Sequence, residues 1–192
     1  MTPQKVKIDF SSGTLLIQAE PEQMIPVVDM VKYDERVKRF RARACDYAPI
    51  LRELKSCDVE FIDRARDYQP VQLEIKNGFP PREHQQQALD AWKASNCRGV
   101  VAMPTGSGKS YLAVMAIAML KRPAIVIVPT IDLLQQWASL LEKFFQTEVG
   151  MLGGGSKEVR TLTVSTYDSA VLQMEFIGNK FGLVIFDECH HL

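Results

Sequence analysis

The 192-residue sequence has no excess charge of either sign, because 23 Lys and Arg residues balance 23 Asp and Glu residues. The balance also holds locally: residues up to Gly78 include 13 basic and 13 acidic side chains, and 10 of each follow. Bulk charge therefore neither favours nor excludes nucleic acid as a partner. Only the local arrangement of charge can decide that question.

Cysteine pairs, long apolar runs and repeats are also missing. The four cysteines lie far apart and form no C-x-x-C pair, which fits neither a disulfide framework nor a zinc site. No apolar run approaches the roughly 18 residues that span a bilayer, and the first ten residues contain no apolar core like that of a signal peptide. These absences predict reduced thiols in a cytoplasmic protein with no membrane partner.

The first part of the chain predicts a small α+β domain over residues 1–70, followed by a linker over 71–78. Apolar and polar residues alternate on both sides of Ser12-Gly13, which is typical of a β-hairpin. The predicted elements are a hairpin over 6–17, a loop holding Pro21 and Pro26, a helix over 47–54 and a strand around 59–61.

From Phe79 onward, short apolar runs alternate with helical segments. This rhythm predicts an α/β domain over 79–192, with a parallel sheet and helices on both of its faces. After a helix opened by Pro80-Pro81, the predicted strands cover 99–103, 124–128, 162–165 and 183–186, and the predicted helices cover 109–120, 131–145 and 167–174.

A phosphate-binding loop is predicted between the strand over 99–103 and the helix that follows. Its residues are Pro104, Thr105, Gly106, Ser107, Gly108, Lys109 and Ser110. Glycines let backbone N–H groups turn toward phosphates, Lys109 would neutralise the β and γ phosphates of ATP, and Ser110 would bind Mg²⁺. Met103 departs from the pattern G-x-x-x-x-G-K-[ST], whose first position is glycine.

The apolar run over 183–186 ends in two carboxylates, Asp187 and Glu188. Ligands of parallel sheets bind beyond the carboxyl ends of the strands. Asp187 would therefore hold Mg²⁺, and Glu188 would act as the general base that activates the attacking water. An acidic strand end by itself is weak evidence for a nucleotide site. Together with Lys109 and Ser110 it predicts binding and hydrolysis of a nucleoside triphosphate.

These motifs resemble those of superfamily-two helicases, and the set is similar to archaeal XPB-type helicases. Residues 187–192 read DECHHL, residues 128–130 with Leu133, Gln136 and Trp137 resemble motif Ia, and residues 163–170 resemble motif Ic. Residues 33–47 resemble part of the damage-recognition domain of the archaeal proteins. The resemblance implies a RecA-like fold and an ATP-dependent DNA helicase or translocase acting in nucleotide excision repair.

The resemblance also implies roles for residues outside the two ATP motifs. Arg82 and Gln85 match the adenine-contacting Q-motif, with His84 where tyrosine is usual, and His190 would couple nucleotide to nucleic acid. Thr130, Gly153 and Thr166 fall in motifs that touch the nucleic-acid backbone. The alternatives are a solvated glutamine at Gln85 and ordinary loop residues at the other three positions.

The basic stretch over 32–43 includes Arg39, Phe40 and Arg41, and its cations and aromatics suit phosphate neutralisation and base stacking. The alternative is a solvated face with structural ion pairs. DNA contact at these three residues is therefore one hypothesis, and the solvated face is the other.

The chain ends just after the acidic box, so we expect a second RecA-like domain, carrying the arginine finger, in a longer protein. The resemblance also implies a repair nuclease as a partner. Two other interpretations stay open: the motor of a restriction system or phage helicase, and a DNA-binding module without catalytic activity. The residues after Leu192 would decide the first, and an ATPase assay with and without DNA would decide the second.

Overall fold

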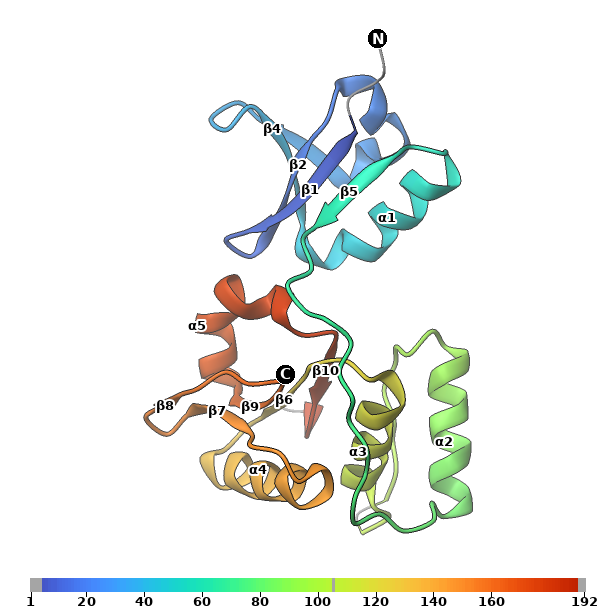
Figure 1. The fold of residues 1–192 in the computed structure, drawn as a ribbon, viewed down its shortest axis with the longest axis vertical. Coiled ribbons are helices and arrows are strands. Elements are labelled where there is room, and N and C mark those ends of the chain that lie inside the picture. The colour runs from blue at the N-terminus through green and yellow to red at the C-terminus, as the bar shows by residue number, and fades with distance from the viewer. Residues whose placement is uncertain (1–4, 105, 190–192) are drawn as a thin grey trace. The chain divides into compact units, whose positions relative to one another are not determined.

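The computed structural model describes residues 5–104 and 106–189. The chain divides into two compact units (Figure 1). The first unit runs to Tyr68 and also takes in Val171–Lys180, and the second holds Gln69–Ala170 and continues from Phe181. Each unit has its own sheet and its own hydrophobic core.

The first unit is built on a five-stranded mixed sheet in the order β3-β4-β2-β1-β5. Its strands are β1 (Val6–Ser11), β2 (Thr14–Gln18), β3 (Val31–Asp34), β4 (Arg39–Arg43) and β5 (Phe61–Arg64). All neighbouring pairs are antiparallel except β1 and β5, which run parallel. The predicted hairpin is confirmed, with Ser12 and Gly13 at positive φ in the two-residue turn between β1 and β2.

Helical segments and one face of this sheet form the first core. The segments are η1 (Pro21–Met30), η2 (Ala44–Asp46) and α1 (Tyr47–Ser56). Val6, Ile8, Leu15 and Ile17 from the sheet and Ile50 from α1 are among its buried members. Because successive side chains of a strand point to opposite faces, the residues between these apolar ones lie on the other face.

The basic stretch over 32–43 forms most of an antiparallel β-hairpin, which the sequence pattern did not predict. Arg39, Arg41 and Arg43 alternate along β4 with the less polar Phe40 and Ala42. Only the pairing with β2 and β3 makes this alternation recognisable as a strand with one buried face. The loop expected around Pro21 and Pro26 is the 3-10 segment η1.

The second unit is a mostly parallel α/β sheet in the order β10-β6-β9-β7-β8, and the predicted fold class is confirmed. Only β7 and β8 pair antiparallel. Its elements are α2 (Glu83–Ala94), α3 (Lys109–Leu120), β6 (Ala124–Val128), α4 (Ile131–Phe145), β7 (Gly150–Gly153), β8 (Ser156–Lys157), β9 (Leu162–Thr166), the start of α5 (Tyr167–Ile177) and β10 (Leu183–Phe186). The rest of α5, from Val171, and η3 (Gly178–Lys180) belong to the first unit. All five residues of β6 are buried, and Ala124, Val126 and Val128 belong to the second core.

The strand predicted over 99–103 is wrong for this structure. These residues have no place in the sheet, and Val100 is 80% exposed. A β-prone apolar run becomes a strand only where a neighbouring edge takes up its backbone hydrogen bonds. In this structure the segment 99–103 and β10 both line one cleft, and β10 forms its hydrogen-bonded ladder with β6.

The segment 71–78, expected as a linker, has no helix or strand but packs onto the second core. Leu73 is buried there, with Val71 and Ile75 beside it. Backbone N–H groups of Val71 and Lys76 donate to the carbonyls of Lys121 and Phe144. The segment is therefore part of the second unit and covers one side of its core.

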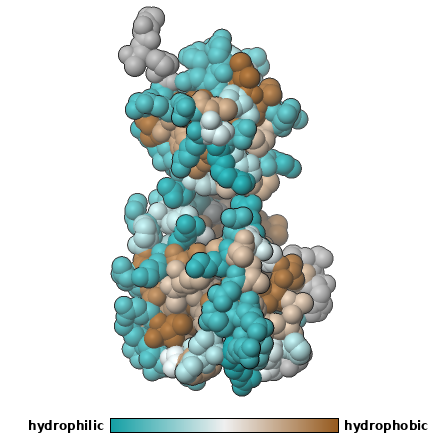
Figure 2. Space-filling view, turned by 90° about the vertical axis from the view of Figure 1, so that its right-hand side faces the viewer, coloured by the Kyte–Doolittle hydropathy of each residue, from teal (hydrophilic) through white to brown (hydrophobic). Residues whose placement is uncertain are grey.

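Hydrophilic side chains cover most of the surface visible in Figure 2, and hydrophobic residues appear there as separate patches. Within the described part of the chain, no helix combines the length and apolar character that crossing a membrane requires.

Candidate ATP-binding site

Lys109, Asp187 and Glu188 line one cleft of about 540 Å³ in the second unit. Lys109 is the first residue of α3, and the two carboxylates follow the last residue of β10. Most of the other lining is apolar and comes from the segment 99–103, α2, α3 and β10. The tertiary structure therefore brings Lys109 together with two carboxylates that lie 78 and 79 positions further along the chain.

The phosphate-binding loop is held closed by its own contacts. The Lys109 ammonium donates a hydrogen bond of 3.0 Å to the carbonyl of Met103, and the Ser107 hydroxyl donates to the carbonyl of Pro104 at 2.6 Å. Gly106 and Gly108 have φ of 76° and 87°, where side chains with a β-carbon are strained. A phosphate chain would replace the Met103 carbonyl as the partner of Lys109.

Gln85 lies beneath this loop and is only 2% exposed. Its Nε2 donates to the carbonyls of Ser107 and Gly108, each at 3.2 Å, and its Oε1 accepts from the Arg82 amide at 2.9 Å. A β-carbon at residue 108 would collide with this amide. The solvated-glutamine interpretation is therefore wrong. The adenine contact stays a prediction, because the side-chain amide of Gln85 here forms its hydrogen bonds with the loop and with the Arg82 amide.

Arg82 and His84 flank Gln85 at the start of α2. Arg82 occupies the N-cap position, and the Nε2 atom of His84 lies 3.1 Å from the carbonyl oxygen of Ser107. Both residues are exposed. The predicted Q-motif residues thus gather at one end of α2, next to the phosphate-binding loop.

Asp187 is fixed by two aromatic side chains. The indole Nε1 of Trp137, on α4, donates to Oδ2 of Asp187 at 2.7 Å, and the Tyr167 hydroxyl donates to the Asp187 carbonyl at 2.8 Å. Burial raises the pKa of the Tyr167 hydroxyl, as do the neighbouring Cys189, Asp187 and Glu188, so this group remains a donor at neutral pH. Trp137 is also a buried member of the second core, and nothing in the sequence pattern pointed to this contact.

Replacing Trp137 with phenylalanine should weaken Mg²⁺-dependent nucleotide binding by about tenfold. Groups that orient a metal ligand without touching the metal are typically worth 10- to 100-fold in metal affinity. Titration of Mg²⁺ at fixed ATP, followed by a fluorescent nucleotide, measures the effect. Trp92→Phe is the matched control, because Trp92 lines the same cleft without a hydrogen bond to the carboxylate. Equal Mg²⁺ curves for Trp137→Phe and the unsubstituted protein would contradict the assignment.

The donor set fits Mg·ATP. Mg²⁺ prefers oxygen ligands and keeps several waters, so one hydroxyl, one carboxylate and the phosphates suffice. Ser110 stands on the first turn of α3, and Asp187 retains unused lone pairs beside its bonds from Trp137 and the Glu188 amide. No cluster of three or more metal-binding acids, cysteines or histidines occurs in residues 5–104 and 106–189.

Thr130, Gly153 and Thr166 follow or end neighbouring parallel strands, and therefore meet at one edge of the sheet. Thr130 caps α4 by accepting from the Leu133 amide at 3.3 Å. Thr166 accepts from the Ser169 amide at 3.3 Å, at the start of α5. A β-carbon at residue 153, where φ is 143°, would lie within 3.1 Å of Thr166. This edge presents two helix N-termini, which suits phosphate groups.

Arg39, Phe40 and Arg41 do not form one cluster. They are consecutive on β4, so Phe40 points to the face opposite both arginines. Phe40 packs against the first core and edge-to-face against Tyr33, with ring centroids 5.2 Å apart. The predicted Thr105 and His190 contacts lie outside the described residues.

A parallel α/β sheet with a phosphate-binding loop and an acidic strand end defines a RecA-like ATP-binding domain. Residues 78–192 match the family described as type III restriction enzyme, res subunit, and residues 8–65 match the xeroderma pigmentosum group B helicase damage recognition domain. The chain belongs to the superfamily-two helicases of the XPB type.

Curated relatives support this membership. The chain is 36% identical to the DNA 3'-5' translocase XPB2 of Sulfurisphaera tokodaii, over 84% of this chain and 36% of the relative. It is 30% identical to the DNA 3'-5' helicase XPB of Mycobacterium tuberculosis, over 64% of this chain and 24% of the relative. The chain thus spans about a third or less of the length of these relatives.

A solved structure supports the fold. The crystal structure of the UvsW helicase from bacteriophage T4 superposes with a TM-score of 0.51 at 18% identity, covering 97% of this chain and 83% of that one. At this identity the likeness concerns the fold alone.

Proposed function

We propose that the chain is the ATP-binding and DNA-engaging part of an ATP-dependent DNA helicase or translocase that acts in nucleotide excision repair in the cytoplasm. The observation that carries the proposal is the convergence of Lys109, Asp187 and Glu188 on one cleft of an XPB-type chain. The names of the relatives, a DNA translocase and a DNA helicase, support DNA as the substrate.

Each residue of the site has a chemical task in this proposal. Lys109 leaves the Met103 carbonyl and neutralises the terminal phosphates, while the loop amides surround them. Ser110 and Asp187 hold Mg²⁺, which supplies charge neutralisation at the β and γ phosphates when bound. Glu188 accepts a proton from the water that attacks the γ phosphorus. The hydrogen bond from Trp137 keeps Asp187 oriented meanwhile.

We propose further that Thr130, Gly153 and Thr166 contact the DNA backbone at the sheet edge of the second unit. A strand held at the N-termini of α4 and α5 would lie on the helix that carries Trp137. DNA binding and the acidic box would then be linked through α4. A second RecA-like domain is expected to complete the ATP site, and a repair nuclease is the expected partner.

The damage-recognition match over residues 8–65 favours an XPB-type repair enzyme over a restriction or phage motor. The full-length protein should therefore hydrolyse ATP faster when DNA is added, whatever the DNA sequence, because backbone contacts carry no sequence information. Steady-state phosphate release with and without duplex DNA measures this. Equal non-zero rates would contradict coupling of hydrolysis to DNA, and no phosphate release in either condition would leave the catalytically silent DNA-binding module.

A further inference from the structure

The first unit has as many bases as acids, twelve of each over residues 5–68, yet the fold separates them. Strand pairing determines which side chains share a face. The face of the sheet away from α1 and η1, here called the open face, carries Lys7, Asp9, Ser11, Thr14, Leu16, Gln18, Lys32, Asp34, Arg39, Arg41, Arg43, Ile62 and Arg64. Six of these are cations and two are acids.

The acids that balance this excess lie elsewhere in the unit. Glu22 and Asp29 belong to η1, Glu53 belongs to α1, and Asp63 points to the helix side, where it accepts a hydrogen bond from Tyr47. Asp46 of η2 forms an ion pair of 2.8 Å with Arg43. With that pair counted as neutral, the open face carries three more positive than negative charges, so a neutral domain has become polarised. Such a face attracts phosphate even when the net charge of the domain does not.

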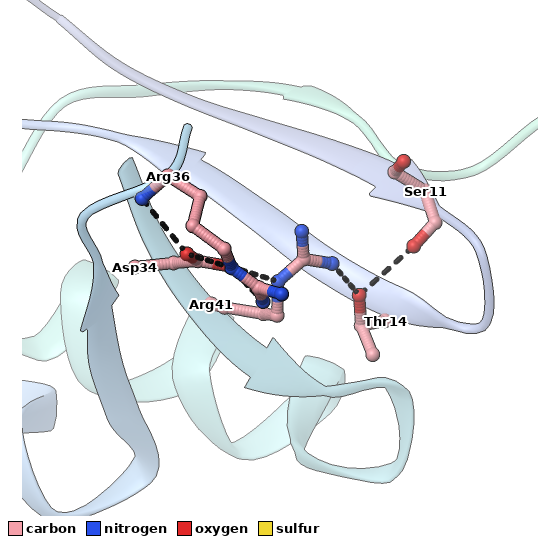
Figure 3. Close-up of polar contacts among 5 residues, drawn as sticks. All are labelled: Ser11, Thr14, Asp34, Arg36 and Arg41. Atoms are coloured by element: carbon pink, nitrogen blue, oxygen red, sulfur yellow. Dashed lines mark hydrogen bonds and ion pairs between the residues drawn. The ribbon is translucent and has the colours of Figure 1, made fainter. Parts of the chain in front are cut away.

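A hydrogen-bonded network orders the middle of the open face (Figure 3). Asp34 accepts from Arg36 at 3.0 Å and from Arg41 at 3.2 Å, and Arg41 also donates to Thr14, whose hydroxyl donates to the Ser11 carbonyl at 2.8 Å. The hydrogen bond from Arg36 lowers the pKa of the Asp34 carboxyl to about 2, so the anchor stays charged at neutral pH. Arg41 is thereby a fixed charge on the face.

The remaining cations are available to a ligand. Lys7, Lys32, Arg39 and Arg64 make no ion pair with any residue that the structure describes, and Lys32 and Arg64 are exposed. They stand on four different strands, β1, β3, β4 and β5, and so extend across the whole sheet.

None of the residues of the open face named above is aromatic, which favours duplex DNA over single strands as the ligand. Surfaces that bind single strands stack bases on aromatic rings, but Tyr33 and Phe40 point to the other face here. We propose that the open face binds the sugar–phosphate backbone of duplex DNA, independently of sequence. This deepens the proposed function by giving the first unit its own duplex-binding surface, and it rests on DNA being the substrate.

The dimensions agree with a duplex. Five strands at roughly 4.8 Å spacing make a face about 19 Å across. That width exceeds a minor groove of about 6 Å and a major groove of about 12 Å, so cations at both margins can reach phosphates on both sides of a groove.

The test is the salt dependence of duplex binding by the full chain without nucleotide, measured by fluorescence anisotropy on two unrelated sequences. Lys32→Ala/Arg39→Ala should weaken binding by the same factor on both sequences. It should also reduce the slope of log affinity against log salt by about 0.9 for each lost phosphate contact. Arg64→Ala alone should reduce the slope by about 0.9 if the face acts across its full width. Arg52→Ala/Lys55→Ala is the matched control, because both residues lie on α1, and it should leave the slope unchanged.

Unchanged slopes for the Lys32/Arg39 pair, or equal losses in the α1 control, would overturn the proposal. A Phe40→Leu variant that loses binding to single strands while the cation variants bind duplex normally would also overturn it, in favour of base stacking on the other face. Because no ATP is present, a shifted slope in a protein that hydrolyses no ATP would uphold the open face and reject the motor function.

Discussion

In the full-length protein, Glu188→Gln should lower ATP turnover by about 10²- to 10⁴-fold while ATP binding stays within a few-fold of normal. The amide keeps the size of the side chain but cannot accept the proton of the attacking water. Single-turnover hydrolysis and equilibrium binding of a fluorescent nucleotide measure the two effects separately. Glu188 is the second residue after β10 and lines the cleft, so a local change at this residue leaves the core untouched.

Lys109→Ala is the matched variant for this experiment. It removes a positive charge that would face the phosphates, so it should weaken ATP binding as well as hydrolysis. If Glu188→Gln kept near-normal turnover, the general base would have to be another residue. If Lys109→Ala bound ATP normally, the loop would not be the phosphate site.

The 192-residue chain alone should bind Mg·ATP and hydrolyse it about 10³- to 10⁵-fold more slowly than the full-length protein with DNA. That factor is what an arginine finger contributes in related phosphate-loop enzymes, and we propose that a second RecA-like domain supplies it. Phosphate release by both proteins, at nucleotide concentrations that saturate each, isolates the chemical step from binding.

DNA-stimulated turnover by the 192-residue chain at the full-length rate would contradict this account, because all the catalytic groups would then lie within one RecA-like domain. A Glu188→Gln form of the short chain is the control, since it sets the background from contaminating ATPases.

The candidate residues Lys109, Asp187 and Glu188 could be selected from the sequence because their patterns are local, and the structure places all three on one cleft. A glycine-rich loop between an apolar run and a helix, and a strand that ends in Asp187-Glu188, each lie within eight consecutive residues. The strand over 124–128 and the helices over 109–120 and 131–145 have the predicted bounds. The apolar periodicity of α4 is strong, α3 is apolar on nearly all sides, and every residue of β6 is buried.

Features that depend on partners distant in sequence could not be predicted. The segment 99–103 has the composition of a strand, but its backbone has no sheet edge to pair with in this structure. Gln85 sits in a polar Gln-Gln-Gln run, yet it is buried because the loop of residues 104–108 folds over it. Trp137 has the character of a core residue. Its indole finds a carboxylate partner only because the fold places Asp187, 50 positions further along the chain, within hydrogen-bonding distance.

The sequence by itself determined which side chains are candidates to neutralise phosphates, bind Mg²⁺ and accept a proton. The tertiary structure decided which charges act together. The stretch over 32–43 shows a local excess of bases in the sequence, but Lys7 and Arg64 lie far from it and each has acids close by in the chain. Pairing of β3, β4, β2, β1 and β5 sorts bases and acids onto opposite sides of a sheet. The physical reason is that every second side chain of a strand points to the same face. The register with the neighbouring strands then determines which side chains of different strands share a face of the sheet.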